Sequence, residues 1–235
     1  MIPEDSRPLS LADEAYAELR ARIVDCRLAP GSRVTERQLA AELGIGLTPV
    51  RQALSRLDSE DLIRTLPRRG YQIAPLTIES VNDLFQVWRI LGPAIAELAG
   101  QKMPVHAWPT FIAKFRSGLG AMRQTDVSGY LLNAEKLWMA MAEATGNRRL
   151  VAMYVRLVGE LRRVFALILQ DPGAAGALRA LNDYEGFDAP DDPAAFRAFI
   201  EKFIDTAHHE VLGILTSWPS VMQAEVVPPA IWFLN

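Results

Sequence analysis

The chain has 235 residues, 50% of them hydrophobic, and a formal net charge of −3. This composition supports a folded core and excludes a disordered tail, and the net negative charge argues against a protein that coats nucleic acid with its whole surface. The chain lacks a run of uncharged apolar residues long enough for a membrane span, and its start carries acidic residues where a signal peptide needs an apolar segment, so we expect a cytoplasmic protein.

The first predicted elements are two helices. Ser10 and Asp13 have the spacing of a capping box, which predicts the start of an amphipathic helix that ends at 29–31, where a proline and a glycine follow one another. Thr35 then predicts the N-cap of a second, short helix, and Gly44 predicts its end. The chain therefore begins with two helices joined by a short connection.

A third helix and a hairpin are predicted next. Thr48 is expected to be the N-cap of a helix over about residues 48–60, with Pro49 at the first helical position, where its missing N–H costs nothing. Two strand-like runs, 62–65 and 71–74, flank a basic turn that contains glycine. Three helices followed by a basic hairpin predict a winged helix-turn-helix.

The basic residues of this part of the chain are all arginines. Residues 1–75 contain eleven arginines and no lysine. The planar guanidinium fork suits phosphate groups and guanine edges better than an ammonium group does. The bias therefore favours a DNA-binding function for the predicted winged helix-turn-helix.

The rest of the chain shows only helical periodicity. Six helical stretches predict an all-α bundle, so the fold class is mainly α, with a DNA-binding domain at 1–75 and an all-α ligand-binding and dimerisation domain at 76–235. The apolar end at 226–234 is expected either to dock on its own bundle or to contact a second subunit. The six stretches are about 77–99, 104–124, 126–145, 147–170, a broken stretch near 174–186, and 193–216.

Residues of the first domain at 28–40, 43–44, 48–54, 57, 62–63 and 67–70, and of the second at 84–89 and 144–147, form a recognisable pattern. In this pattern the first domain resembles the GntR superfamily of bacterial regulators, and the second is similar to the effector-binding (FCD) domain of its FadR branch. This resemblance implies a homodimer that binds an inverted-repeat operator in double-stranded DNA. It also implies that a small molecule in the helical domain changes the DNA affinity.

The resemblance also implies which residues contact DNA. One arginine lies near the start of the second helix, two residues lie on the recognition helix, and the wing reaches the minor groove. A helix N-terminus favours phosphate, and arginine can read the O6 and N7 atoms of guanine, so the chemistry agrees. The residues are Arg37, Thr48, Arg51, and Gly70 with Arg68 or Arg69.

The residues just before Thr48 depart from the family pattern. Family members usually carry Ser-Arg or Thr-Arg there, whereas this chain has Gly46 and Leu47. The missing arginine removes a contact worth roughly 1–3 kcal/mol. Leu47 either packs as a hydrophobic staple against the helix that follows or meets a thymine methyl group. We therefore expect an unusual operator or weaker binding.

The metal ligands of the FadR branch are replaced by apolar residues. Many of these domains bind a divalent metal through one Asp and three His, so apolar replacements predict a site without metal or other cofactor. The site then either binds an organic effector, is filled by its own Trp138 and Phe203, or is plain hydrophobic core. The four corresponding residues are Ala134, Trp138, Leu181 (with an alignment uncertain by one turn) and Phe203.

Two polar residues are candidates for holding an effector in this site. Arg89 occupies a position where the family often directs an arginine into the cavity, and such a side chain suits a carboxylate. Asn133 supplies a polar group if the register slips by one residue. Gly92 and Pro93 replace the usual pair after Arg89 and are expected to kink that helix.

The remaining reactive side chains give no sign of catalysis. His208 and His209 are adjacent on the last helix, so they cannot both face one metal, and we expect them to be exposed. The single Cys26 cannot form an internal disulfide and is expected to be a small helix residue near the surface. No nucleophile elbow, phosphate-binding glycine loop or metal-hydrolase helix is present, so we do not expect an enzyme.

Two functions therefore remain for the chain. The first is a repressor or activator that responds to a small-molecule effector. The alternative is an effector-independent DNA-binding or architectural dimer, in which the helical domain serves only for dimerisation. A shift in melting temperature with small carboxylic acids that depends on Arg89 would favour the first function.

Overall fold

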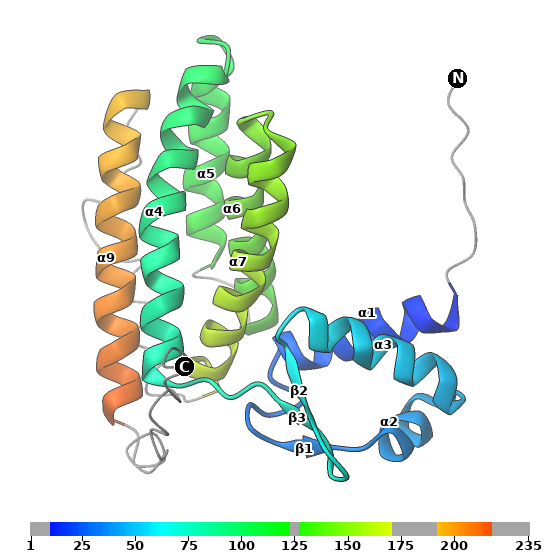
Figure 1. Cartoon of the computed structure of the whole chain (residues 1–235). Helices are drawn as coiled ribbons and strands as arrows, with labels where there is room; N and C mark the ends of the chain where they lie inside the picture. Colours follow the sequence, from blue (N-terminus) through cyan, green and yellow to red (C-terminus); the bar gives the residue numbers. More distant parts are fainter. Residues whose placement is uncertain (1–9, 123–126, 171–191, 218–235) are drawn as a thin grey trace, which may run out of the picture.

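A computed structural model of the protein describes residues 10–122, 127–170 and 192–217. A small N-terminal unit of helices and a short sheet lies beside a bundle of long helices (Figure 1). The predicted fold class is confirmed: a winged helix-turn-helix is followed by an all-α bundle. The stretch predicted near 174–186 and the apolar end at 226–234 lie outside the described residues.

Helix α1 (Leu11–Val24) begins as the sequence predicts and ends earlier. The Asp13 amide donates to Ser10 Oγ at 3.2 Å, and the Asp13 carboxylate accepts from the Ser10 amide at 3.3 Å, which completes the capping box. The helix ends at Val24 because Cys26 turns the chain with a positive φ of 54°.

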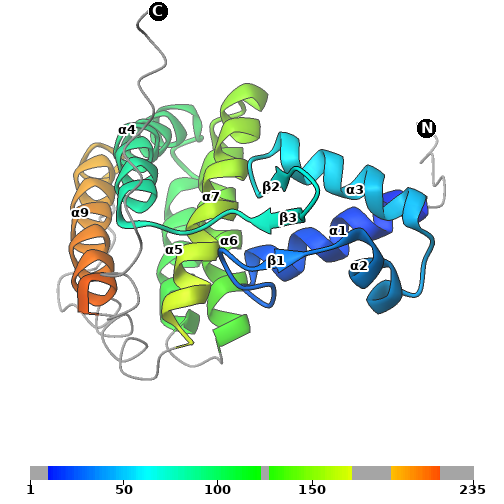
Figure 2. The ribbon, with the colours of Figure 1, turned by 60° about the horizontal axis from the view of Figure 1, so that its bottom comes forward.

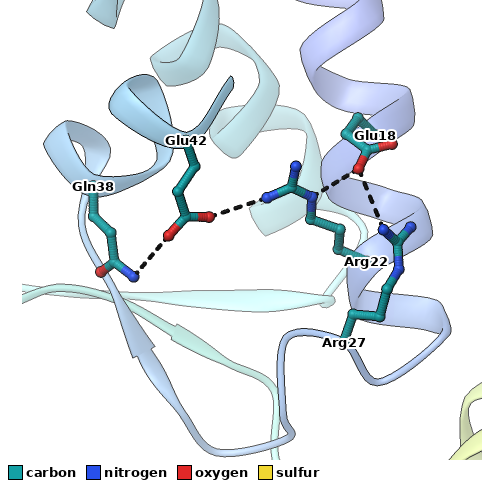
Figure 3. Close-up of polar contacts among 5 residues, drawn as sticks. All are labelled: Glu18, Arg22, Arg27, Gln38 and Glu42. Carbon is teal, nitrogen blue, oxygen red and sulfur yellow. Dashed lines mark hydrogen bonds and ion pairs between the residues drawn. The ribbon is translucent and has the colours of Figure 1, made fainter. Parts of the chain in front are cut away.

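Helix α2 (Glu36–Leu43) has the predicted caps. The Gln38 amide donates to Thr35 Oγ1 at 3.2 Å, and Gly44 ends the helix in the left-handed conformation. A polar network connects α2 to α1 (Figure 3): Arg22 donates to Glu18 at 2.7 Å and to Glu42 at 3.0 Å. Such exposed ion pairs are individually weak, so we assign them to orienting α2 rather than to overall stability.

Helix α3 (Leu47–Ser59) begins earlier than predicted, and the assignment of Thr48 as N-cap was wrong. Gly46 is the N-cap and offers no side-chain acceptor, so Pro49 falls at the third helical position. A proline is tolerated there because the first four N–H groups of a helix have no acceptor within the helix. The buried face is the predicted one: Val50, Ala53, Leu54 and Leu57.

Three antiparallel strands form the wing sheet in the order β1-β3-β2. The hairpin of β2 (Ile63–Leu66) and β3 (Gly70–Ile73) was predicted, whereas β1 (Arg33–Val34) is too short to show a strand pattern. Gly70 has a φ of 86°, and a Cβ added to it would lie 2.5 Å from the Val34 carbonyl oxygen. The wing therefore needs glycine at this position so that β1 can approach.

The described part of the bundle consists of α4 (Ile78–Lys102), α5 (Trp108–Met122), α6 (Val127–Ala144), α7 (Arg148–Ile168) and α9 (Pro193–Ser217). Helix α4 packs against α6, α7 and α9. It continues as one helix through Gly92 and Pro93, and a Cβ on Gly92 would lie 2.6 Å from Ile204 Cδ1. The glycine thus allows α9 to approach α4 closely. None of the helices in these described stretches is long and apolar enough to cross a membrane.

Aromatic residues dominate the core of the bundle. Trp88, Phe85, Phe115, Phe196 and Tyr154 are fully buried. Trp88 Nε1 donates to Tyr154 Oη at 3.0 Å, which satisfies two polar groups inside the core. Burial also raises the pKa of the Tyr154 hydroxyl, so this group stays protonated.

Helix α7 lies between the rest of the bundle and the N-terminal domain (Figure 2). Cys26 is buried here and packs with the bundle core, with its Sγ 3.4 Å from the Arg163 carbonyl oxygen. The expectation that Cys26 is a helix residue near the surface was therefore wrong, because α1 ends before it and α7 covers it.

We expect the Cys26 thiol to react with a thiol reagent at least about ten times more slowly in the native protein than in the denatured chain at pH 8. Burial raises its pKa from 9.0 to about 11, so little thiolate forms. Labelling kinetics measure this directly, since the chain has one cysteine. Because the folded protein keeps this proton to higher pH than the unfolded chain, the thiol lowers stability only as pH rises above about 9. Equal labelling rates would contradict the prediction.

Candidate functional site

Arg51 lies at the exposed start of α3 and is held by a carboxylate. Its Nη2 and Nε atoms donate to Glu36 at 2.8 and 3.1 Å, and the side chain of Arg51 remains 65% exposed. Tyr71 Oη, on β3, donates to the same carboxylate at 3.0 Å. Glu36 therefore joins the wing, α2 and α3 in one network, and any ligand of the Arg51 guanidinium must compete with this carboxylate.

The hydrogen bond from Arg51 keeps Glu36 ionised. It is the largest cause that lowers the pKa of the Glu36 carboxyl group, and the Tyr71 hydroxyl lowers it further. Sequence reasoning missed both Glu36 and Tyr71. Their only signal was indirect: Glu36 directly follows the N-cap of α2, and Tyr71 directly follows the wing glycine.

The other residues predicted to contact DNA are exposed or half-buried on the same three elements. Figure 1 shows α2 and the tip of the hairpin on the lower side of the N-terminal domain. Arg68 adopts a positive φ of 63° in the turn of the wing. Arg37, Gly46, Leu47, Thr48, Arg68 and Arg69 are exposed, and Gly70 is half-buried.

Leu47 does not form the predicted staple. With the N-cap at Gly46, the staple positions fall on Ile45 and Val50, and Ile45 packs against the core cluster that contains Val50. Leu47 instead occupies the first helical position with 42% of its surface exposed. Of the two interpretations, a hydrophobic staple and contact with a thymine methyl group, only the second is compatible with this exposed position.

The wing sheet carries two further exposed arginines that sequence reasoning did not single out. Arg33 on β1 and Arg64 on β2 both pair with Gln72 of the central strand. Residues paired across a sheet lie on one face, so both guanidinium groups belong to the same surface of the wing. The arginine bias of the N-terminal domain was the signal that could have indicated them.

A pocket of about 430 Å³, counting the solvent at its mouth, lies among α4, α6, α7 and α9. Three of the positions aligned with metal ligands line it, namely Ala134, Trp138 and Phe203, whereas Leu181 lies outside the described residues. The rings of Trp138 and Phe203 pack at 5.2 Å, and Trp138 packs edge-on to Trp88 at 5.2 Å. An apolar pocket therefore exists at these positions, and the rings of Trp138 and Phe203 form part of its wall.

The charged residues at this pocket are Glu135 and Arg162. Arg162 Nη1 donates to Glu135 Oε2 at 2.5 Å, while its Nε and Nη2 donate to Asp25 Oδ1 at 3.0 and 2.8 Å. Sequence reasoning missed all three residues, because Asp25 and Arg162 are far apart in the chain. Asn133 is half-buried on α6 and is not part of the lining. In the described stretches of the chain, no three His, Cys, Asp or Glu side chains are placed to hold a metal ion.

Arg89, predicted to hold an effector, is not among the residues that line this pocket. Its Nε donates to Asp205 at 2.7 Å and its Nη2 donates to His208 Nδ1 at 2.9 Å. His208 is buried rather than exposed, stacks on Phe85, and donates from Nε2 to Asn82 Oδ1 at 2.8 Å. Burial lowers the pKa of His208, so the ring is neutral and accepts from Arg89. Asp205 and His208 thus engage the Arg89 guanidinium between α4 and α9.

Exposed arginines on α2, at the start of α3 and in the wing fit a winged helix-turn-helix that contacts DNA, and comparisons with known proteins agree. Residues 11–73 match the family model "Bacterial regulatory proteins, gntR family", and residues 83–185 match the FCD domain model. The chain belongs to the GntR family of DNA-binding transcriptional regulators and carries an FCD effector-binding domain. The family consists of transcriptional regulators, which agrees with the expectation that the protein is not an enzyme.

Individual relatives and solved structures are consistent with this assignment. An uncharacterized HTH-type transcriptional regulator from the TAR-I ttuE-ttuC′ intergenic region of Agrobacterium vitis is 30% identical over 127 residues, which are 52% of this chain and 73% of that protein. The gluconate operon transcriptional repressor of Bacillus licheniformis is 33% identical over 84 residues, 36% of this chain and 34% of that protein. The structure of E. coli McbR/YncC shares the fold, with a TM-score of 0.71, 18% identity, and coverage of 88% of this chain and 99% of that one.

Proposed function

We propose that the protein binds an inverted-repeat operator as a homodimer and that a small molecule in the pocket of the bundle changes this affinity. The observation that carries the proposal is the position of α7. This helix lines the pocket through Arg162 and contacts the DNA-binding domain through the same side chain. A change in the pocket therefore has a physical route to the DNA interface.

The DNA contacts that we propose come from three elements. Arg51 and Thr48 at the start of α3 enter the major groove, where the exposed N–H groups of the helix also favour phosphate. Arg37 contacts the backbone from α2. The wing reaches the minor groove with Arg68 or Arg69 beside Gly70. Gly46 and Leu47 occupy the positions that usually carry an arginine, so the operator differs from the usual one of the family.

The proposed effector is an organic molecule held without metal. The support for an organic ligand is the chemistry of the lining, because apart from Glu135 and Arg162 the walls of the pocket are aromatic and aliphatic. A carboxylate held by Arg89 is not supported, because Asp205 and His208 engage that guanidinium outside the pocket. The cation that lines the pocket is Arg162 instead.

Genomic fragment selection with the full-length protein, followed by fluorescence anisotropy on an enriched fragment, tests the DNA-binding part of the proposal. Nuclease footprinting of the enriched fragment should show protection of two half-sites, and the anisotropy titration should give a stoichiometry of two chains per operator. The same titration is then repeated in the presence of a library of small organic molecules. Failure to enrich any fragment would overturn the proposal. Enrichment without any response to the library would favour the effector-independent dimer.

A further inference from the structure

Helix α7 fixes the DNA-binding domain on the bundle through contacts from several residues. Arg163 is buried, with 4% of its surface exposed, and donates to the carbonyl oxygen of Ala74, where the wing joins the bundle. The carbonyl oxygen of Arg163 accepts from Cys26. Gly159 lies against the Arg20 guanidinium, since a Cβ added to it would be 2.9 Å from Arg20 Nη2. These contacts make α7 the element against which the N-terminal domain is positioned.

Arg162 adds a bridge that spans from the pocket to this domain junction. One end of its guanidinium holds Glu135 on α6, at the wall of the pocket, and the other holds Asp25 at the end of α1. The side chains of Arg162 and Asp25 are only 20% and 30% exposed, so solvent screens this pair less than it screens a surface pair. Movement of α6 relative to α7 therefore changes the hydrogen bonds that Arg162 offers to Asp25.

The charges of the bridge restrict the ligand. Two carboxylates already share the one guanidinium, so Asp25, Glu135 and Arg162 together carry one negative charge. An acid would have to displace one of these carboxylates, and a buried amine would lack a carboxylate of its own, because Glu135 is paired. The rest of the wall is apolar and includes the rings of Trp88, Trp138 and Phe203. An uncharged aromatic molecule meets these conditions without breaking an ion pair.

We propose that the pocket binds a compact, uncharged aromatic molecule and that the Asp25–Arg162–Glu135 bridge transmits its presence to the DNA-binding domain. The inference rests on the proposed function and specifies its ligand and its coupling. A ligand between α6 and α7 separates Glu135 from Arg162, and the guanidinium then loses its position beside Asp25. The N-terminal domain changes its orientation relative to α7 as a result.

Three molecules of similar size but different charge test the ligand class: benzyl alcohol, benzoate and benzylamine. Isothermal titration of the full-length protein at pH 7 should give binding of benzyl alcohol at least about tenfold tighter than that of the two ions. Ala134→Leu, which adds bulk to the lining, should weaken binding of benzyl alcohol. Tighter binding of benzoate or benzylamine, no binding of benzyl alcohol, or unchanged binding to the Ala134 variant would overturn the assignment of ligand and site.

The coupling is tested with Asp25→Asn, which removes one end of the bridge and leaves the pocket lining intact. Saturating benzyl alcohol should change the operator affinity of the wild-type protein by about fivefold or more. In the Asp25 variant this change should fall below about twofold, with the affinity for benzyl alcohol itself retained. Arg197→Gln is the matched control, because it breaks ion pairs to Glu97 and Glu201 elsewhere in the bundle. It should respond as the wild type does.

The two proposals fail in different ways. If benzyl alcohol and every compound of the library leave the operator affinity of the wild-type protein unchanged, the proposed effector function is overturned, and the bridge with it. If a compound changes the affinity of the wild type and of the Asp25 variant by the same factor, only the bridge is overturned. If the responding compound is charged, the proposed ligand class is wrong. The bridge is then tested by comparing the responses of the wild type and of the Asp25 variant to that compound.

Discussion

Replacement of Arg51 by alanine should weaken operator binding by about 1–3 kcal/mol, a loss of roughly fivefold to more than a hundredfold in affinity. The guanidinium lies at the start of the recognition helix and is 65% exposed, while Glu36 fixes its direction through two of its nitrogen atoms. A bidentate contact to guanine loses both hydrogen bonds on truncation. Arg51→Lys keeps the charge but loses the fork, so its affinity should be intermediate.

Fluorescence anisotropy at fixed salt, with a selected operator fragment and a scrambled one, measures this effect. Arg56→Ala is the matched control on the same helix, because Arg56 lies 3.7 Å from the centre of the Tyr16 ring and pairs with Asp13 of α1. It should change operator affinity far less than Arg51→Ala does. If Arg51 reads a base, its loss also reduces the preference for the operator over the scrambled fragment. Equal affinities of the Arg51 variant and the wild type would contradict its role in DNA binding.

Local signals in the sequence were sufficient for most of the N-terminal domain. The capping box of Ser10, the Thr35 cap and the left-handed Gly44 depend on residues within a few positions of one another, and all three are found in the structure. The start of α3 was misplaced because Thr48 is a strong N-cap type, whereas the chain uses Gly46, which leaves no side-chain signal. Strand β1 was missed because its two residues pair with β3 only through the tertiary fold.

The candidate site shows the same division between local and tertiary information. Alignment with the family pattern found Ala134, Trp138 and Phe203 because their positions on helices are fixed by sequence spacing. It could not find that Arg162 bridges Asp25 and Glu135, since this pairing depends on the packing of α1 and α6 against α7. The environment of Arg89 could not be predicted for the same reason. Its partners Asp205 and His208 lie on α9, and which side chains meet there depends on how α4 packs against α9.

Trp88→Ala should lower the free energy of unfolding of the bundle by about 3–5 kcal/mol. Trp88 is 1% exposed and packs against Phe85, Trp138 and Phe203, so its removal leaves a cavity at the centre of four helices. The Tyr154 hydroxyl, fully buried, would also lose its hydrogen bond from Trp88 Nε1. Urea unfolding followed by circular dichroism and by the remaining tryptophans measures the loss.

Two variants separate the contributions of Trp88 to the core. Trp88→Phe keeps most of the apolar volume but removes the hydrogen bond. Its free energy of unfolding should therefore lie between those of the wild type and the Trp88→Ala variant. Ile90→Ala is the control on the same helix, because Ile90 is 70% exposed and its truncation should change stability by no more than about 0.5 kcal/mol. Since Trp88 also lines the pocket, the alanine variant enlarges the space beside Trp138. An aromatic compound that fills this space should restore part of the lost stability. If the Trp88→Ala variant were instead as stable as the wild type, the core would not depend on this ring.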